Sequence, residues 1–424
     1  MADPPERPRR TDVGRQPVND STRTRSVRPT QPRSVHPTPP PALPKVVVCG
    51  TSFGRVYLQA AHEDPNVELA GVVSRGSAAS LDCAKTYGVP HYTGIDALPD
   101  DIDIACVAVR AGVAGGDGAA LAQSLLARGI HVLQEHLLHP DELAECLRTA
   151  REYGVRYRLN AFYPQLRPVQ LFLRAAELLR ERQQPLHVDA VAGGQMVYPL
   201  LDMIGRAVGR LRPWALSEPA PVPPELAALA DRPMPYTHLT GVIGGVPLSL
   251  RVQNQIHPAD PDNHALLLHR LAIAFDSGVL TLADTHGPVL WSPRLHTGRD
   301  EAGRLIMAGP GTERLAVPTT EVLEPADIPT FRTVFDELWP QSVRTALAQL
   351  RADIADPRRS IGAGQWAVTV TAIWQRLTTA IGQPELIRPP APTPVPLPEL
   401  LAASRSDCLR VARNGQAAMI GDLV

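Results

Sequence analysis

A short β-branched run that ends at a glycine turn restricts the fold of this chain more than any other feature. Residues 45–50 read KVVVCG, and Thr51, Ser52, Phe53 and Gly54 lead from this run into RVYLQAA, which has helical spacing. A buried strand that turns on glycine into a helix is typical of the first unit of a parallel α/β fold.

Strands and helices continue to alternate after this turn. The pattern predicts further strands over residues 67–74, near His91 and over 102–109 and 130–133, with helices over 77–87 and 118–128. Because parallel strands need a crossover connection, the alternation predicts right-handed βαβ units and a parallel sheet. We therefore expect an α/β Rossmann domain over residues 45–165.

The glycine turn predicts a dinucleotide site. The usual fingerprint is G-x-G-x-x-G, and here Gly50-Thr51-Ser52-Phe53-Gly54 has serine at the second glycine and a last interval one residue shorter. Alone this motif is weak, but it follows a strand and opens a helix, where the backbone can approach a pyrophosphate.

The end of the second strand favours NADPH over NADH. An acidic residue there would bind the ribose hydroxyls of NAD, but this sequence has Ser74, Arg75 and Ser77. A guanidinium and two hydroxyls at a helix N-terminus suit a 2′-phosphate. The alternative is that Arg75 is a solvated loop residue of an arginine-rich chain. Arg110, after the strand over 102–109, is a further candidate contact for cofactor phosphate or substrate.

The second half predicts an α+β domain over residues 166–385. A helix over 168–181 precedes a strand over 187–192, and strand pairs flank Gly244-Gly245 and Asp276-Ser277-Gly278. Tight turns between strands predict a largely antiparallel, open-faced sheet with helices on one face. This order of domains resembles the glucose-fructose oxidoreductase/inositol dehydrogenase (Gfo/Idh/MocA) superfamily.

Composition sets limits on the termini and the class of partner. Residues 1–44 hold eleven of the 44 prolines and few large apolar side chains, so we expect a disordered leader, with a Pro-rich linker and tail over 386–424. A net charge of −1 argues against nucleic-acid binding, and no apolar run is long enough for a membrane span. Five cysteines without a CxxC pair, and no secretory signal, predict a cytoplasmic protein.

The segment Gln134-Glu135-His136-Leu137 carries the chemistry. In the superfamily just named this place usually reads Glu-Lys-Pro, and its lysine serves the reaction at the nicotinamide. Lys45 and Lys85 are the only lysines here, so oxidation of an alcohol by the lysine mechanism is excluded. His136 and His139 do not follow the HExxH order and have no clear third ligand, so no metal site is predicted. His139 precedes a helix, where a structural role is expected.

A narrower resemblance follows from several segments. The chain is similar to thiazolinyl imine reductases, which serve siderophore assembly lines of the pyochelin and yersiniabactin type. The likeness covers about residues 45–380. It is carried by the segments VVVCGTSFGRVYL, DIACVAVRAGVAGGDGAALA, GIHVLQEHLLHPDEL, RLNAFYPQLRP, NHALLLHRLAIAF and GPVLWSP. Its most specific parts are QEH-LHP and N-x-FYP. The resemblance implies NADPH-dependent reduction of a thiazoline C=N bond to a thiazolidine, on a nonribosomal peptide intermediate tethered to a peptidyl carrier protein.

Two side chains are candidates for the acid that such a reduction needs. Hydride addition to an imine carbon leaves negative charge on nitrogen, which a positioned acid should protonate. His136 and Tyr163 follow consecutive strands of the parallel sheet, where ligands bind, and the resemblance points to the same pair. Which of them delivers the proton stays open, as does a purely structural role for either.

Other residues are expected around this pair. Asn160 is a candidate for holding either the nicotinamide amide or the loop, and Glu135 is grouped with the cofactor-binding residues. Tyr198 and Asp202 are expected to line the substrate site, because the wider superfamily often keeps polar residues on this helix. Trp291, expected at a strand end, is interpreted as core.

Two other functions are kept as alternatives: a sugar or polyol dehydrogenase of the wider superfamily, and a non-catalytic NADP-binding protein. The missing lysine counts against the first, and the proton-donor candidates count against the second. A homodimer through the open sheet face is expected by analogy, and contact with a carrier protein should be transient.

Overall fold

The computed structural model describes residues 42–402, apart from 261–262 and 325–327. Most of the predicted leader, up to residue 41, lies outside the described residues, and so does the end of the predicted tail, 403–424.

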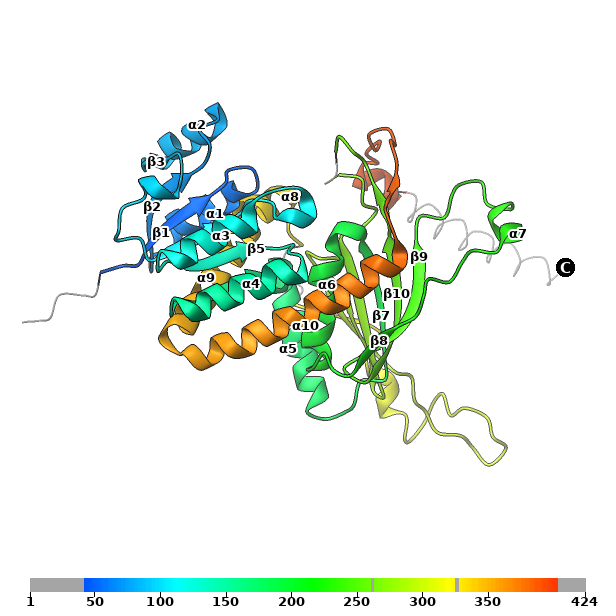
Figure 1. Ribbon diagram of the computed structural model, residues 1–424. Coiled ribbons are helices and arrows are strands. Elements are labelled where there is room, and N and C mark those ends of the chain that lie inside the picture. The colour runs from blue at the N-terminus through cyan, green and yellow to red at the C-terminus, as the bar shows by residue number, and fades with distance from the viewer. Residues whose placement is uncertain (1–41, 261–262, 325–327, 403–424) are drawn as a thin grey trace, which may run out of the picture. The chain divides into compact units, whose positions relative to one another are not determined.

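The first sheet has six parallel strands in the order β3-β2-β1-β4-β5-β6 (Figure 1). Its strands are β1 Lys45–Cys49, β2 Glu68–Val73, β3 His91–Tyr92, β4 Ile104–Val107, β5 His131–Glu135 and β6 Tyr157–Asn160. The connecting helices are α1 Gly54–Glu63, α2 Ala78–Thr86, α3 Gly118–Ala127 and α4 Pro140–Glu152. The predicted Rossmann domain is confirmed.

Strand β1 is apolar throughout because both faces of this sheet are covered. Val46 and Val48 are fully buried in the core formed with α1, whereas Val47 and Cys49 are fully buried in a second core formed with α3 and α4. The period of two in a strand sends successive side chains to opposite faces. Cys106 in β4 is also fully buried, so Cys49 and Cys106 are both small core residues.

The second sheet has eight strands in the order β15-β14-β13-β12-β7-β10-β9-β8. Only β7 and β10 pair in parallel; the other neighbours are antiparallel. The strands are β7 His187–Gly193, β8 Trp214–Leu216, β9 Thr237–Ile243, β10 Val246–Gln253, β12 His269–Phe275, β13 Gly278–Leu282, β14 Val289–Pro293 and β15 Glu321–Leu323. The fold class, a Rossmann domain followed by a largely antiparallel α+β domain, is therefore confirmed.

Both predicted strand pairs are present. Ile243 pairs with Val246 across Gly244-Gly245, and Phe275 pairs with Gly278. Helices α5 (Arg167–Arg180) and α6 (Val197–Val208) pack on one face, and alternate residues of β12 and β13 are more exposed on the other. The sheet thus has one covered and one open face, as expected.

Some elements differ from the sequence-based expectation. Trp291 lies in the middle of β14 rather than at its end, although it does pack against the core. The edge strand β8, which directly follows Pro213, was not predicted. A small parallel pair, β11 (Gln255–Ile256) and β16 (Glu385–Leu386), was also missed. The short helices α7 (Pro224–Ala227) and α8 (Phe331–Thr333) lie in connections.

Two long helices close the described part of the chain. Helix α9 (Trp339–Ala355) packs against α1, and α10 (Pro357–Ile381), orange in Figure 1, packs against α4, β6 and α6. No helix among the described residues is both long and apolar enough to cross a membrane.

A buried ion pair connects β6 to α9. Nη2 of Arg158 lies 2.7 Å from Oδ2 of Asp353, and their side chains are 15% and 1% exposed. Burial lowers the pKa of the Arg158 guanidinium, and the Asp353 carboxylate opposes this effect. Each charge is therefore tolerated in the interior because the other is present.

We expect Asp353→Ala to lower the free energy of unfolding by about 3–5 kcal/mol, because it leaves the Arg158 charge buried without its partner. As a control, Glu145→Ala removes the exposed ion pair of Glu145 with Arg148 on α4 and should cost about 0–1 kcal/mol. Urea unfolding of both variants checks this. Equal losses would show that the buried pair adds nothing to stability.

Candidate active site

The glycine turn after β1 lies where the predicted dinucleotide site requires it. Gly50 has φ 88°, and a Cβ there would lie 2.8 Å from the carbonyl oxygen of Ala108. Only glycine therefore fits at this close approach to the chain that follows β4. Thr51, Ser52 and Phe53 then lead to Gly54, the first residue of α1. The turn opens at the carboxyl ends of the parallel strands.

Hydroxyl groups from three segments meet beside this turn. The Oγ of Ser80 lies 2.8 Å from Oγ1 of Thr51 and 2.7 Å from Oγ of Ser77, which caps α2. Ser74 contacts Nε2 of His91 through its Oγ at 2.8 Å, and Arg75 is exposed next to it. Ser80 was not among the predicted residues; its position one helical turn after Ser77 was the available signal.

The hydroxyl residues Thr51, Ser74, Ser77 and Ser80 line a cavity of about 670 Å³. Arg75, Arg110 and the glycines at 115 and 116 line it too. The cavity combines a backbone turn at a helix N-terminus, several hydroxyls and two arginines, which is the donor set that a dinucleotide phosphate prefers. A Cβ at Gly50 would clash with the backbone carbonyl of Ala108, so this turn needs glycine. The residues present therefore fit a nicotinamide dinucleotide.

His136 follows β5 and is oriented by its neighbours. Its Nδ1 lies 3.0 Å from Oε1 of Glu135 and 3.2 Å from the carbonyl oxygen of Asn160. Both neighbours are acceptors, so Nδ1 carries a proton and Nε2 is left to exchange one. The side chains of His136 and Glu135 are only 8% and 13% exposed.

Tyr57 of α1 completes this network, and apart from its helical spacing no sequence pattern predicted this role. Its hydroxyl donates to Oε2 of Glu135 and accepts from Nδ2 of Asn160, at 2.7 Å in the second case. Burial and the Glu135 charge raise the pKa of Tyr57 well above its ordinary value, so the phenol stays protonated and remains a donor. The Glu135 carboxylate therefore has two partners within the protein, Tyr57 and His136.

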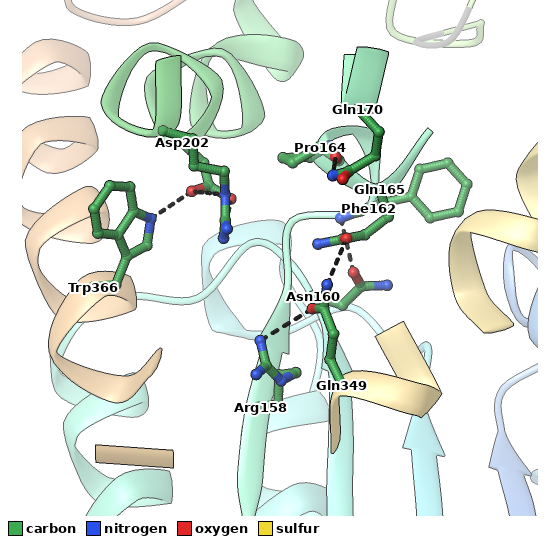
Figure 2. Close-up of polar contacts among 10 residues, drawn as sticks. Arg158, Asn160, Phe162, Pro164, Gln165, Gln170, Asp202, Gln349 and Trp366 are labelled. Atoms are coloured by element: carbon green, nitrogen blue, oxygen red, sulfur yellow. Dashed lines mark hydrogen bonds and ion pairs between the residues drawn. The ribbon is translucent and has the colours of Figure 1, made fainter. Parts of the chain in front are cut away.

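Asn160 holds the loop that carries Tyr163. Figure 2 shows its carboxamide directed at the backbone of Phe162, whose N–H donates to Oδ1 at 2.9 Å. Phe162 has φ 59°, and its carbonyl accepts from Oγ of Ser342 at 2.7 Å. Such a backbone conformation is strained for a residue with a side chain and persists only where its surroundings enforce it. Of the two predicted roles for Asn160, the structure shows the loop contact.

Tyr163 lies near His136, as their positions after consecutive strands predict. The two ring centroids are 6.5 Å apart, and the Tyr163 side chain is buried. On its other side the ring of His269 lies 5.0 Å away, edge to face. The two acid candidates predicted from the sequence therefore lie in one site.

His269 is a neighbour of Tyr163 that the sequence did not predict. Its Nε2 lies 2.9 Å from the carbonyl oxygen of Met196, and its Nδ1 lies 2.9 Å from Oγ1 of Thr285. A carbonyl can only accept, so Nε2 carries the proton and Nδ1 accepts from Thr285. Burial lowers the pKa of His269 to about 3, so this ring stays neutral near pH 7. The segment NHALLLHRLAIAF held this histidine, but no spacing linked it to the site.

Tyr198 and Asp202 lie one turn apart on α6 and have different surroundings. The Tyr198 ring stacks on His136, with centroids 5.6 Å apart and planes 20° apart. Asp202 instead pairs with Arg206, whose Nε lies 2.9 Å from Oδ1, and accepts from Nε1 of Trp366 (Figure 2). Tyr198 is thus brought to the candidate acid, whereas the Asp202 carboxylate is 3% exposed and engaged by other residues.

His139 caps α4. Its Nδ1 accepts from the N–H of Asp141, and its own N–H donates to Glu142 at 2.8 Å, which forms a capping box. The structural role expected for His139 is confirmed.

Two family models match the chain. Residues 44–161 match the oxidoreductase family with a NAD-binding Rossmann fold (GFO_IDH_MocA), and residues 183–292 match "Thiazolinyl imine reductase Irp3-like, C-terminal". No curated protein matches the sequence.

Solved structures share the fold at low identity. GenD2 from gentamicin A biosynthesis, in complex with NAD, has 16% identity and a TM-score of 0.54, over 82% of this chain and 97% of that one. KijD10, a 3-ketoreductase from Actinomadura kijaniata in complex with NADP, has 14% identity and a TM-score of 0.54, over 82% and 100%. A myo-inositol dehydrogenase from Corynebacterium glutamicum has 13% and 0.51, over 82% and 100%.

These neighbours show the fold; GenD2 was solved with NAD and KijD10 with NADP. The nicotinamide-binding fold of this chain is given by the family model over residues 44–161. The two family models cover the Rossmann domain and most of the second sheet in the expected order. The chain is an oxidoreductase that belongs to the Gfo/Idh/MocA superfamily and, within it, to the thiazolinyl imine reductase family.

Proposed function

We propose that this oxidoreductase uses NADPH to reduce the C=N bond of a thiazoline to a thiazolidine, on an intermediate tethered to a peptidyl carrier protein in siderophore-type biosynthesis. The observation that carries the proposal is the pairing of His136 with Tyr163 at the carboxyl ends of β5 and β6, in a chain that has no lysine there. The thiazolinyl imine reductase model over residues 183–292 supports it.

The chain's part in this reaction is to place an acid beside the imine nitrogen. When bound, NADPH supplies the hydride that goes to the imine carbon. Nitrogen then needs a proton, and either Nε2 of His136 or the Tyr163 hydroxyl supplies it. Glu135 holds Nδ1 of His136, which leaves Nε2 for exchange. Burial of both side chains keeps water from competing.

The sugar-type neighbours do not favour a different reaction. Their likeness shows the fold alone, and Lys45 and Lys85 both lie elsewhere in the Rossmann domain. A homodimer through the open sheet face, transient contact with the carrier and a cytoplasmic location are part of the same proposal.

We expect purified protein to oxidise NADPH when a synthetic acyl-thiazoline is supplied and to form the matching thiazolidine, because the site provides an acid for nitrogen. Absorbance of the nicotinamide and mass spectrometry of the product check this. Glucose and myo-inositol serve as controls and should give no turnover. Reduction of a sugar-derived ketone with no reaction of the thiazoline would contradict the proposal.

We expect the proton donor of the pair to be identified by Tyr163→Phe and His136→Asn. Loss of the donor should lower kcat about 10²–10⁴-fold, since this is the usual range for general acid catalysis, while the Kd for NADPH stays unchanged. Tyr153→Phe removes an exposed hydroxyl after α4 and is the matched control. Wild-type turnover in both site variants would remove the proposed acid pair.

We expect Arg75 to determine the preference for NADPH. Loss of a charge-assisted hydrogen bond to the 2′-phosphate costs about 1.5–3 kcal/mol, so Arg75→Ala should raise KM for NADPH about 10- to 100-fold and leave KM for NADH nearly unchanged. Lys85→Ala, in the last turn of α2, removes a cation away from the cavity and serves as control. An unchanged NADPH:NADH ratio in Arg75→Ala would assign this choice to other residues.

A further inference from the structure

A cationic groove lies on the face of the molecule formed by α4, α10 and the loop after α6. It has a volume of about 1040 Å³. Four arginines line it, Arg151, Arg156, Arg210 and Arg212, and none of the described residues that line it is acidic. The whole chain has a net charge of −1, so the positive charge is local to this groove. A concave surface of one charge sign attracts ligands of the other sign.

Two of these arginines are anchored and two are available. Nε of Arg210 donates to the carbonyl oxygen of Gly244 at 2.7 Å, and Nη1 of Arg156 donates to that of Val155 at 3.0 Å. Arg151 and Arg212 are exposed, and their guanidinium groups have no hydrogen bond or ion pair with any described residue. Their planar donor sets match a phosphate.

The groove is long, and part of its wall is apolar. Residues of α10 from Pro357 to Thr369 line it, which at 1.5 Å per residue covers about 18 Å of helix. Ile361 and Val368 on this helix are 64% and 43% exposed. A long slot with apolar walls and unpaired cations suits an extended, flexible molecule that carries one phosphate group.

An inner cavity adjoins this groove. It has a volume of about 330 Å³ and shares Tyr157 and Trp366 with the groove as lining residues. Asp202 and Tyr198 form part of its wall, and the Tyr198 ring stacks on His136. Trp366 thus lies between groove and inner cavity, and Tyr198 lies between the inner cavity and His136.

We propose that the groove binds the phosphopantetheine arm of the carrier protein, with Arg151 and Arg212 contacting its phosphodiester and the inner cavity admitting its thiazoline end. This inference rests on the proposed function. The arm has its phosphate at the protein end, then a chain of amides and methylenes, and the acyl group at the far end. The phosphate would meet the arginines, the chain would follow the apolar wall of the groove, and the acyl group would enter the inner cavity. Because Tyr198 is buried, its ring must turn aside to admit the thiazoline.

The test compares one acyl-thiazoline in two forms, loaded on the holo carrier protein and as its N-acetylcysteamine thioester, which lacks the phosphate. The variant is Arg151→Glu/Arg212→Glu. We expect kcat/KM for the carrier substrate to fall about tenfold or more, because two charge-assisted contacts are lost. The short thioester should react as with wild type, which also reports that the variant is folded. Arg174→Glu/Arg182→Glu, at an exposed position of α5 and in the exposed turn after it, makes the same charge change and should affect neither substrate.

The outcomes separate the two proposals. If wild type reduces neither form, the proposed function fails. If wild type reduces both and the arginine variant also reduces both at full rate, or loses both equally, the groove does not bind the arm although the function stands. Competition by unloaded carrier distinguishes the source of the anion: the holo form should inhibit wild type more strongly than the apo form. Equal inhibition would assign the groove to an acidic protein surface and overturn the arm assignment.

Discussion

Asn160 ties together the segments that carry the candidate site. Its Nδ2 donates to the Tyr57 hydroxyl, its Oδ1 accepts from Phe162, and its carbonyl oxygen accepts from the N–H of His136. The residue is 2% exposed, so a lost partner would leave a buried polar group unsatisfied, at a cost of about 1–3 kcal/mol. The orientations of His136 and Tyr163 therefore both depend on this residue at the end of β6, His136 through its backbone carbonyl and the Tyr163 loop through its side chain.

The surroundings of the two histidines near Tyr163 give them different abilities. Both ring nitrogens of His269 are engaged, by Met196 and Thr285, and burial keeps the ring neutral, so it can only position its neighbours. His136 uses Nδ1 for Glu135 and Asn160, and its Nε2 has no hydrogen bond to a described residue. Of these two histidines, only His136 can therefore exchange a proton with a bound molecule.

Local pattern was sufficient for most strands. It also predicted the two acid candidates, because the carboxyl ends of parallel strands meet at one sheet edge. It was insufficient for Tyr57, which lies 78 residues before its partner Glu135, and for Ser342, which lies 180 residues after Phe162. Such contacts depend on how α1 and α9 pack, and no short-range signal encodes that. Asp202 was predicted from its helix position, but its pairing with Arg206 and Trp366 was not.

The exchange of lysine for histidine has a consequence for the direction of the chemistry. In the proposed reaction an imine takes up one proton in every turnover, so the acid must be recharged from solvent in a site that is nearly closed. An imidazole can pass between its charged and neutral forms near neutral pH. Glu135 beside it accepts from Nδ1 and keeps the ring oriented. The proposed route through the cavity lined by Tyr198 brings the substrate to this acid without opening the rest of the site to solvent, because Tyr198 separates that cavity from His136.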